Sequence, residues 1–299
     1  MPRSQRPFRY IRSYQLSDQL RNGNYAQERL SGAQPLILRT ASSIVALPTA
    51  AAAQVNTMQT ANGVAWEFYQ TTAQTLQPIG NAKGIVIDGD QVDNESAEFV
   101  PGGNYSTAPF AFTVPSSTNA GSSDFFFEAT LEITDASGSD QLLVGFRKQE
   151  AFAVPTSFLT GGDGIYTDFF GIGFCATKAN PNPVGTASDL NNSGVTVATP
   201  TGFTWADAGI NKLGVRVVGG RAIGYINGVR LGNPVAVDGV GTAITAIDTV
   251  TTPSFTFDAG DTLVPFIFVR QDADLTDAVY LRSYAVGNLV EAGLDPNAE

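Results

Sequence analysis

The stretch "NKLGVRVVGGRAIGYINGVRLG", from Asn211 to Gly232, contains two tight-turn signals between short alternating runs. Gly219-Gly220 and Asn227-Gly228 are pairs whose residues tolerate the positive φ angles of two-residue hairpin turns. The apolar residues of the first run alternate with polar or small ones, so one face of that strand is expected to be buried. The stretch therefore predicts a β-hairpin followed by a third short strand.

Similar apolar or alternating runs recur from residue 81 onward, separated by Gly, Pro, Asn and Asp. No long segment shows the periodicity of a helix. The runs predict about ten to twelve strands, a number typical of a jelly roll built from two sheets. With 43% hydrophobic and only 15% charged residues, the chain also has the apolar material for a large core. The sequence thus predicts an all-β fold in which residues 81–299 form a jelly-roll β-sandwich domain.

The order of the runs resembles the concanavalin-A-like lectin/glucanase superfamily, laminin-G-like modules included. The runs that carry the resemblance are, in chain order, "FFFEATLEITD", "LLVGFRK", "FFGIGFCAT", the hairpin stretch, "LVPFIFVRQ" and "AVYLRSYAV". They cover about residues 85 to 290. The resemblance implies a concanavalin-A-like sandwich, a fold that serves both sugar binding and sugar hydrolysis, so function has to be argued from particular residues.

Glycoside hydrolases of this superfamily carry a carboxylate cluster of the form Glu-x-Asp-x-Glu or Glu-x-Asp-x-x-Glu on one strand. The nearest match is "EATLE", in which Thr130 replaces the middle Asp between Glu128 and Glu132. Strand positions four apart lie about 13 Å from each other, whereas a retaining pair needs about 5 to 5.5 Å. The chain has no histidine, and its one cysteine, Cys175, lies in an apolar run. We therefore predict no catalytic residue and no enzyme, with glycoside hydrolysis as the third alternative.

A sugar-binding site would need exposed aromatic rings and polar groups around them. Trp205, Asp272 and Asp274 are the candidate sugar-binding residues, although a tryptophan in a β-protein also commonly packs in the core. The acidic loop "DGDQVDNE" at residues 88–95 offers oxygen ligands but lacks the glycine and final glutamate spacing of an EF-hand. An acidic surface turn is the favoured interpretation of that loop, so no metal and no cofactor are predicted.

Residues 1–80 are predicted to form an extended basic arm or assembly segment. Residues 1 to 39 hold seven Arg against two acidic residues, a net charge of +5, which leaves −16 for the rest of a chain whose total is −11. Arginine and aromatic residues can dock on an acidic protein surface, bind nucleic acid, or belong to a solvated tail. A protein partner is favoured, because the acidic body would repel phosphate. The expected anchoring residues are Arg3, Arg6, Phe8, Arg9, Tyr10, Arg12 and Tyr14.

These features together favour a non-enzymatic virion protein of a bacteriophage, such as a capsid decoration, cement or head-fibre protein made in the host cytoplasm. Neither a secretion signal nor a membrane span is recognised, since the most apolar early segment, "IVALPTAAAA", is short and interrupted by Pro48. The expected partners are the major capsid protein and further copies of the chain. The expected oligomeric state is a trimer. The alternative function is a carbohydrate-binding attachment module that recognises surface glycans.

Deleting residues 1 to 15 should abolish association with the particle, because the arginines and aromatic rings of the anchor are removed together. Co-sedimentation of the truncated and full-length chains with purified particles measures the effect. Retained association of the truncated chain would show that residues 1 to 15 are not the anchor.

Overall fold

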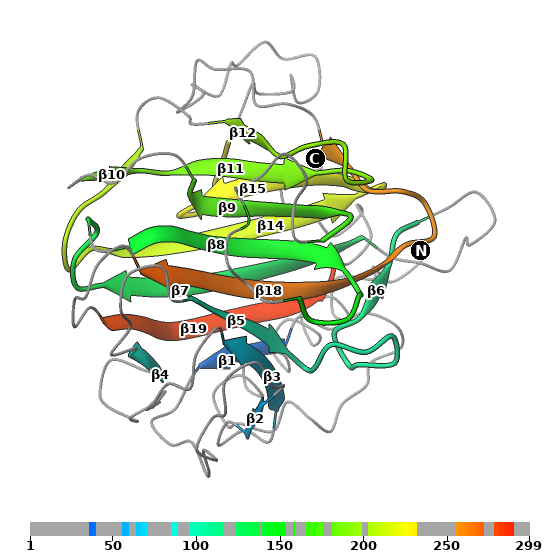
Figure 1. Cartoon of the computed structure of the whole chain (residues 1–299), viewed down its shortest axis with the longest axis horizontal. Coiled ribbons are helices and arrows are strands. Elements are labelled where there is room, and N and C mark those ends of the chain that lie inside the picture. Colours follow the sequence, from blue (N-terminus) through cyan, green and yellow to red (C-terminus); the bar gives the residue numbers. More distant parts are fainter. Residues whose placement is uncertain are drawn as a thin grey trace, which may run out of the picture.

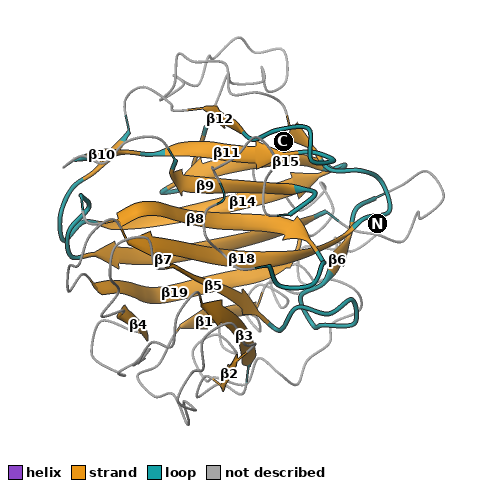
Figure 2. Cartoon of the chain, in the orientation of Figure 1, coloured by secondary structure: helices purple, strands orange, loops and turns teal. Residues whose placement is uncertain are grey.

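The computed structural model describes thirteen stretches of the chain, and within them every regular element is a β-strand (Figure 2). The described residues are 36–39, 56–59, 64–70, 85–88, 96–115, 124–137, 139–153, 158, 166–175, 181–198, 203–231, 255–271 and 278–289. They contain no helix long and apolar enough to cross a membrane. The predicted all-β fold class is confirmed.

The strands follow one another along the chain with turns and loops between them. They are β1 (Leu36–Arg39), β2 (Asn56–Gln59), β3 (Ala65–Gln70), β4 (Ile85–Asp88), β5 (Ser96–Pro101), β6 (Phe112–Thr113), β7 (Phe125–Ile133), β8 (Ser139–Lys148), β9 (Phe169–Phe174), β10 (Asn182–Pro183), β11 (Gly185–Asp189), β12 (Thr196–Ala198), β13 (Thr204–Trp205), β14 (Ile210–Val218), β15 (Arg221–Ile226), β16 (Val229–Arg230), β17 (Phe255–Thr256), β18 (Thr262–Gln271) and β19 (Ala278–Asn288).

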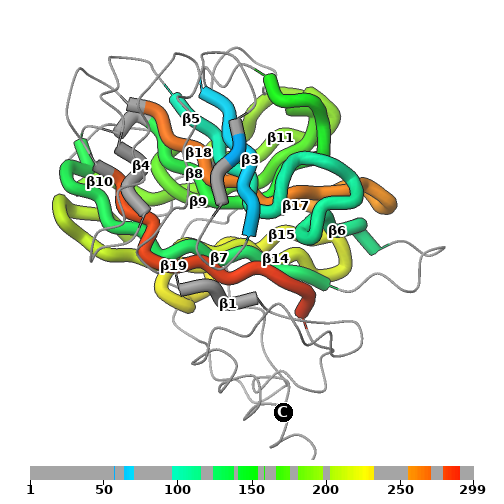
Figure 3. The backbone as a smooth tube through the Cα atoms, turned by 90° about the horizontal axis from the view of Figure 1, so that it is seen from below, coloured from blue at the N-terminus to red at the C-terminus, as the bar shows by residue number. Residues whose placement is uncertain are grey.

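Two antiparallel sheets stack face to face, as Figures 1 and 3 show. The eight-stranded sheet has the order β1-β19-β7-β14-β15-β16, with β17 beside β15 and β4 beside β19. The nine-stranded sheet has the order β12-β11-β9-β8-β18-β5-β3-β2, with β6 beside β18. Strands β10 and β13 form a small separate ladder. This arrangement is the predicted β-sandwich.

The hairpin predicted from the opening stretch is present as β14, β15 and β16. Asn227 and Gly228 have φ angles of 52° and 83°, as a two-residue turn of the hairpin type requires. The backbone N–H of Asn227 donates to the carbonyl of Lys212 at 2.7 Å, and its side-chain Oδ1 accepts from the Lys212 N–H at 2.8 Å. The asparagine side chain therefore extends the ladder between β14 and β15 into the turn.

The core lies between the sheets, and β7 at the centre of the eight-stranded sheet shows how the sequence builds it. Residues of β7 alternate in burial, and the odd-numbered ones face the core: Phe125, Phe127, Ala129, Leu131 and Ile133. Phe146 of β8 meets Phe125 edge to face, with ring centroids 5.0 Å apart. Glu128 and Glu132 of the same strand lie on the opposite face.

A second apolar cluster covers the outer face of the nine-stranded sheet and encloses a charged pair. Arg147 of β8 donates through Nε to Glu98 of β5 at 2.5 Å, and the Tyr166 hydroxyl donates to the same carboxylate at 2.5 Å. Both charged side chains are fully buried. The Arg147 guanidinium also lies over the rings of Tyr166 and Phe152, at 4.0 and 5.3 Å. The free-energy cost of burying Arg147 and Glu98 is offset because each charged group contacts several partners.

The sandwich begins earlier in the chain than the sequence analysis placed it. Strands β1, β2 and β3 lie within residues assigned to the arm, yet β1 pairs with β19 and β3 pairs with β5. Trp66 and Phe68 of β3 are buried in the main core. The boundary at residue 80 therefore cuts through the sandwich, because the partners of these early strands lie far along the chain and local sequence does not identify them.

Gly145 of β8 is a position where the two central strands leave no room for a side chain. A Cβ there would lie 2.0 Å from the carbonyl oxygen of Phe170 in β9, which is backbone and cannot rotate away. At Gly214 of β14 the nearest atom is Cγ of Glu128 at 2.9 Å, in a side chain that can move. Gly145→Ala should lower the free energy of unfolding by about 3 kcal/mol and Gly214→Ala by under about 1 kcal/mol. Equal losses in urea titrations of the two variants would contradict this packing.

Candidate functional site: the aspartate cluster

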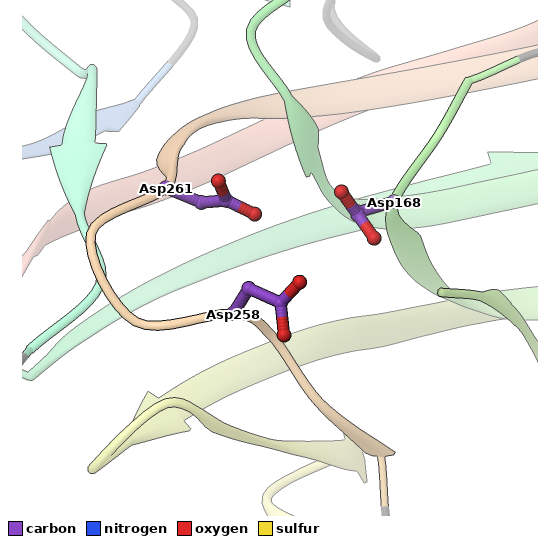
Figure 4. A group of neighbouring side chains, drawn as sticks. All are labelled: Asp168, Asp258 and Asp261. Atoms are coloured by element: carbon purple, nitrogen blue, oxygen red, sulfur yellow. The ribbon is translucent and has the colours of Figure 1, made fainter. Parts of the chain in front are cut away.

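Three carboxylates converge at one end of the nine-stranded sheet. Asp168 immediately precedes β9, whereas Asp258 and Asp261 lie between β17 and β18. One oxygen of each lies within 4.8 Å of an oxygen of the others, and Figure 4 shows the three side chains pointing toward a common space. The positions meet because β9 and β18 both run antiparallel to β8, so that their first residues flank its last. We call these three residues the aspartate cluster.

Lys148, the last residue of β8, supplies a positive charge within the aspartate cluster. Its Nζ lies 2.9 Å from Oδ1 of Asp261 and 3.2 Å from Oδ2 of Asp168. The hydrogen bond to Asp261, supported by the one to Asp168, raises the pKa of Lys148 above its ordinary value of 10.5. With three carboxylates and one ammonium, the group retains a formal charge of −2 when all members are ionised.

The turn after β11 orders two of the three aspartates. The backbone N–H of Asn191 donates to Oδ1 of Asp168 at 2.7 Å, and its side-chain amide donates to Oδ2 of Asp258 at 3.0 Å. Asn191 and Asn192 have φ angles of 55° and 52°, a conformation that costs non-glycine residues free energy. The hydrogen bonds to the carboxylates offset that cost, so the aspartate cluster and this turn stabilise each other.

The members of the cluster differ in what they can offer a ligand. Asp168 is fully buried, and each of its carboxylate oxygens accepts a hydrogen bond, from Asn191 and from Lys148. The Asp261 side chain is 15% exposed, and its Oδ2 is buried without any hydrogen-bond donor. Asp258 is exposed. The carboxylate of Asp258 is therefore the acceptor that is open to an incoming group, and the Asp261 side chain beside it is exposed only in part.

Three carboxylates are a donor set that Ca²⁺ and other hard cations prefer. Here, however, the ammonium of Lys148 is held by both Asp168 and Asp261. A divalent ion would have to displace this ammonium, so the residues present do not fit a resident metal. The same contacts do not fit the pair of carboxyl groups that a glycoside hydrolase needs. Asp168 is fully buried, and Lys148 is bonded to both Asp168 and Asp261, where the glycosidic bond would have to lie between two carboxyl groups.

A polar rim adjoins the cluster through Lys148, Gln149 and Glu150. Oε1 of Glu150 accepts from the backbone and hydroxyl of Thr167, and burial raises the pKa of the Glu150 carboxyl. The Asn104 amide donates to the Glu150 carbonyl at 2.6 Å, and its backbone N–H donates to Glu67 at 2.7 Å. Tyr105, next in the chain, is 47% exposed. We call Glu67, Asn104, Tyr105, Glu150 and Thr167 the polar rim; it brings an exposed ring and several acceptors to the same end of the sheet.

Of the predicted sugar-binding residues, only Trp205 is described, and its assignment is wrong. Its side chain is fully buried, with Nε1 donating to the carbonyl of Gly209 at 3.0 Å. Its ring meets Phe174 edge to face at 5.5 Å, so neither face is available for a sugar. Asp272 and Asp274 lie outside the described residues and stay predictions.

The anchoring residues predicted near the start of the chain also lie outside the described residues, and their role stays a prediction. They are Arg3, Arg6, Phe8, Arg9, Tyr10, Arg12 and Tyr14.

Glu128 and Glu132, the nearest match to a hydrolase motif, lie on the outer face of the eight-stranded sheet. Glu128 accepts from Lys212 at 3.2 Å, and Glu132 is paired with Arg282. Each carboxylate is thus engaged with a basic residue of a neighbouring strand, and the two do not form a pair with each other.

Sequence reasoning missed the aspartate cluster. Its members stand in "TDFF" and "FDAGD", where an acidic residue beside an apolar run is an ordinary sign of a strand end. Only the order of the strands in the sheet shows that these ends are neighbours.

Comparison with known proteins gives similarity in fold and no closer relationship. No protein-family model matches the chain, and no curated protein matches it. Among solved structures, peanut lectin with a nine-residue peptide is 11% identical, covering 86% of this chain and 97% of its own, with a TM-score of 0.47. Basic winged bean lectin with Tn-antigen is also 11% identical, covering 87% and 99%, with a TM-score of 0.44.

A legume lectin-like domain from Entamoeba histolytica is 9% identical, covering 75% of this chain and 90% of its own, with a TM-score of 0.44. All three of these similar structures are described as lectins or lectin-like domains. At such identities the likeness is one of fold alone, and what those lectins bind is not transferred to this chain.

Replacing Lys148 tests its role as the internal cation. Lys148→Met should lower the free energy of unfolding by about 1 to 3 kcal/mol, because three carboxylates then face one another without their counter-charge. Addition of Ca²⁺ should raise the melting temperature of this variant and leave that of the unaltered chain unchanged. Lys148→Arg, which keeps the charge, is the control and should behave like the unaltered chain.

The raised pKa of Lys148 also sets a pH dependence. The stabilisation is complete below about pH 10.5, the unfolded value, and is lost as pH rises through the raised folded value. Lys148→Met should lack that alkaline loss. Equal stability of the Met variant and the unaltered chain at pH 7 would contradict a counter-ion role.

Proposed function

We propose that this chain is a non-enzymatic carbohydrate-binding protein whose site is the aspartate cluster with the adjoining polar rim. The observation that carries the proposal is the exposed carboxylate of Asp258, which lies beside the partly exposed Asp261 at the open side of the cluster. A carboxylate accepts hydrogen bonds and donates none. Sugar hydroxyls are donors that can supply what these oxygens lack.

The charge of the site restricts the class of sugar. The aspartate cluster with Lys148 retains a formal charge of −2, and Glu67 and Glu150 of the polar rim are further carboxyl groups. Sulfated sugars and uronic acids would be repelled, so neutral or amino sugars are the proposed ligands. The exposed ring of Tyr105 supports this class, because an aromatic face packs against the C–H groups of a sugar ring.

The proposal is for binding without catalysis. Hydrolysis of a glycosidic bond requires one carboxyl group that gives up a proton and a second that acts as nucleophile or base. Both carboxylate oxygens of Asp168 are held by Asn191 and Lys148, and Asp261 is hydrogen-bonded to Lys148. Neither carboxyl group is therefore placed to pass a proton to a bound sugar.

A virion location remains the proposal that the sequence favours, and none of the described residues bears on it. A sugar-binding sandwich held on a particle by residues 1 to 15 would be compatible with both ideas. The two are separable, because the binding residues lie in the sandwich and the anchor precedes it.

Asp258→Asn and Asp261→Asn should each weaken binding to the best neutral or amino glycan at least tenfold, because each removes a charged acceptor from the open side of the cluster. An array of neutral, amino and acidic glycans identifies the ligand, and calorimetry then measures affinity. Glu128→Gln is the matched control, since it removes a carboxylate from the other sheet, and it should leave affinity unchanged. No binding by the unaltered chain, or unchanged affinity in both aspartate variants, would refute the proposed site.

A further inference from the structure

Three arginines form a basic patch on the outer face of the eight-stranded sheet. Arg216 of β14, Arg221 of β15 and Arg230 of β16 all point away from the core, on neighbouring strands. Arg216 lies opposite Ile223 and Arg230 lies opposite Tyr225, so the arginines surround these two side chains. The Arg216 guanidinium lies 4.5 Å from the centre of the Tyr225 ring, which restricts its orientation. We call the three arginines the arginine patch.

The arginine patch differs from Lys212 and Arg282 on the same face, because none of its members has a carboxylate partner among the described residues. Lys212 pairs with Glu128, and Arg282 pairs with Glu132. No carboxylate of the described residues pairs with a member of the patch, and Nε of Arg230 is buried without an acceptor. Guanidinium groups with free donors are suited to paired hydrogen bonds with carboxylates.

The arginine patch is opposite in charge to the chain that carries it. Its three arginines contribute +3. Because residues 40–299 carry −16 in total, those outside the patch carry −19. A second copy of the chain therefore brings a large excess of carboxylates with which the patch can pair.

We propose that the arginine patch docks an acidic surface of a second copy of this chain. Charge complementarity favours this occupant, since each copy carries both the basic face and its acidic counterpart. Two exposed apolar side chains at the two ends of β14, Ile210 at 51% and Val218 at 42%, add area that a protein partner would bury. Stacking one basic face on another would bring arginine against arginine, so the contact is head to tail.

A head-to-tail contact has a defined consequence for assembly. The two surfaces that meet are different, so each copy has one basic surface and one acidic surface to offer. Repetition of the contact closes a ring if the rotation permits and otherwise gives a filament. A closed ring is the kind of symmetric homo-oligomer expected from the sequence.

A polyanion is the competing occupant, and the face is less suited to it. Nucleic acids and sulfated polysaccharides bind to continuous tracks of basic residues. Here Glu128 and Glu132 interrupt the basic residues, and Ile210 and Val218 flank them. The test below treats binding of a sulfated oligosaccharide as a separate outcome.

Sedimentation velocity of the full chain without glycan tests the proposal. The unaltered chain should be oligomeric at low salt and dissociate as salt rises, because the contact is electrostatic. Arg216→Glu/Arg221→Glu should be monomeric in both conditions, whereas the control Arg216→Lys/Arg221→Lys should still associate. Circular dichroism and melting temperature verify that the variants are folded. The salt dependence of the unaltered chain tests the proposal even if the reversed variant fails to fold.

A mixing experiment distinguishes head-to-tail from face-to-face association. The neutral variant Arg216→Ala/Arg221→Ala keeps its acidic residues, so an excess of it should occupy the arginine patch of a fluorescently labelled unaltered chain and reduce the labelled assemblies to small complexes. In a contact between two patches this variant, which has neither arginine nor an introduced carboxylate there, would leave those assemblies intact, and the proposal would fail. A monomeric unaltered chain at low salt would also overturn it, including the case in which that monomer binds a sulfated heparin-derived oligosaccharide through the patch.

Discussion

The contact of Phe146 with the phenylalanines of β7 is the interaction on which the rest of this sandwich depends. Its ring lies edge to face against Phe125 at 5.0 Å and against Phe127 at 6.3 Å, joining the central strands of the two sheets. Since successive side chains of a strand alternate in direction, placing Phe146 in the core directs Arg147 to the opposite face, where it pairs with Glu98. Lys148 then ends the strand and reaches the aspartate cluster.

The features that the sequence predicted are those encoded locally. The alternation of β14 and the Asn-Gly turn after β15 each depend on residues within one strand or hairpin, and both are present. The aspartate cluster depends instead on the pairing of β8 with both β9 and β18, strands that come from distant parts of the chain. The separation of Asp168 and Asp261 along the sequence does not indicate that the strand ends on which they lie are adjacent in the sheet.

The two errors of the sequence analysis have the same physical origin. Trp205 was a candidate for stacking on a sugar ring, yet it is fully buried and packs against Phe174 in the core. Strand β3 stands in a segment of low charge that suggested an arm, yet Trp66 packs edge to face on Tyr284 of the other sheet at 4.8 Å. In both cases an aromatic side chain is buried by residues far away in the sequence. Local composition does not predict burial of this kind.

The most direct test of the proposed binding site is a backbone-amide chemical-shift map of the isotopically labelled chain during titration with neutral and amino disaccharides. The proposal predicts that the perturbed amides are confined to the acidic end of the nine-stranded sheet, around residues 148–150, 168, 191 and 258–261. Perturbations centred on the outer face of the eight-stranded sheet, or no perturbation with any sugar of either class, would contradict it.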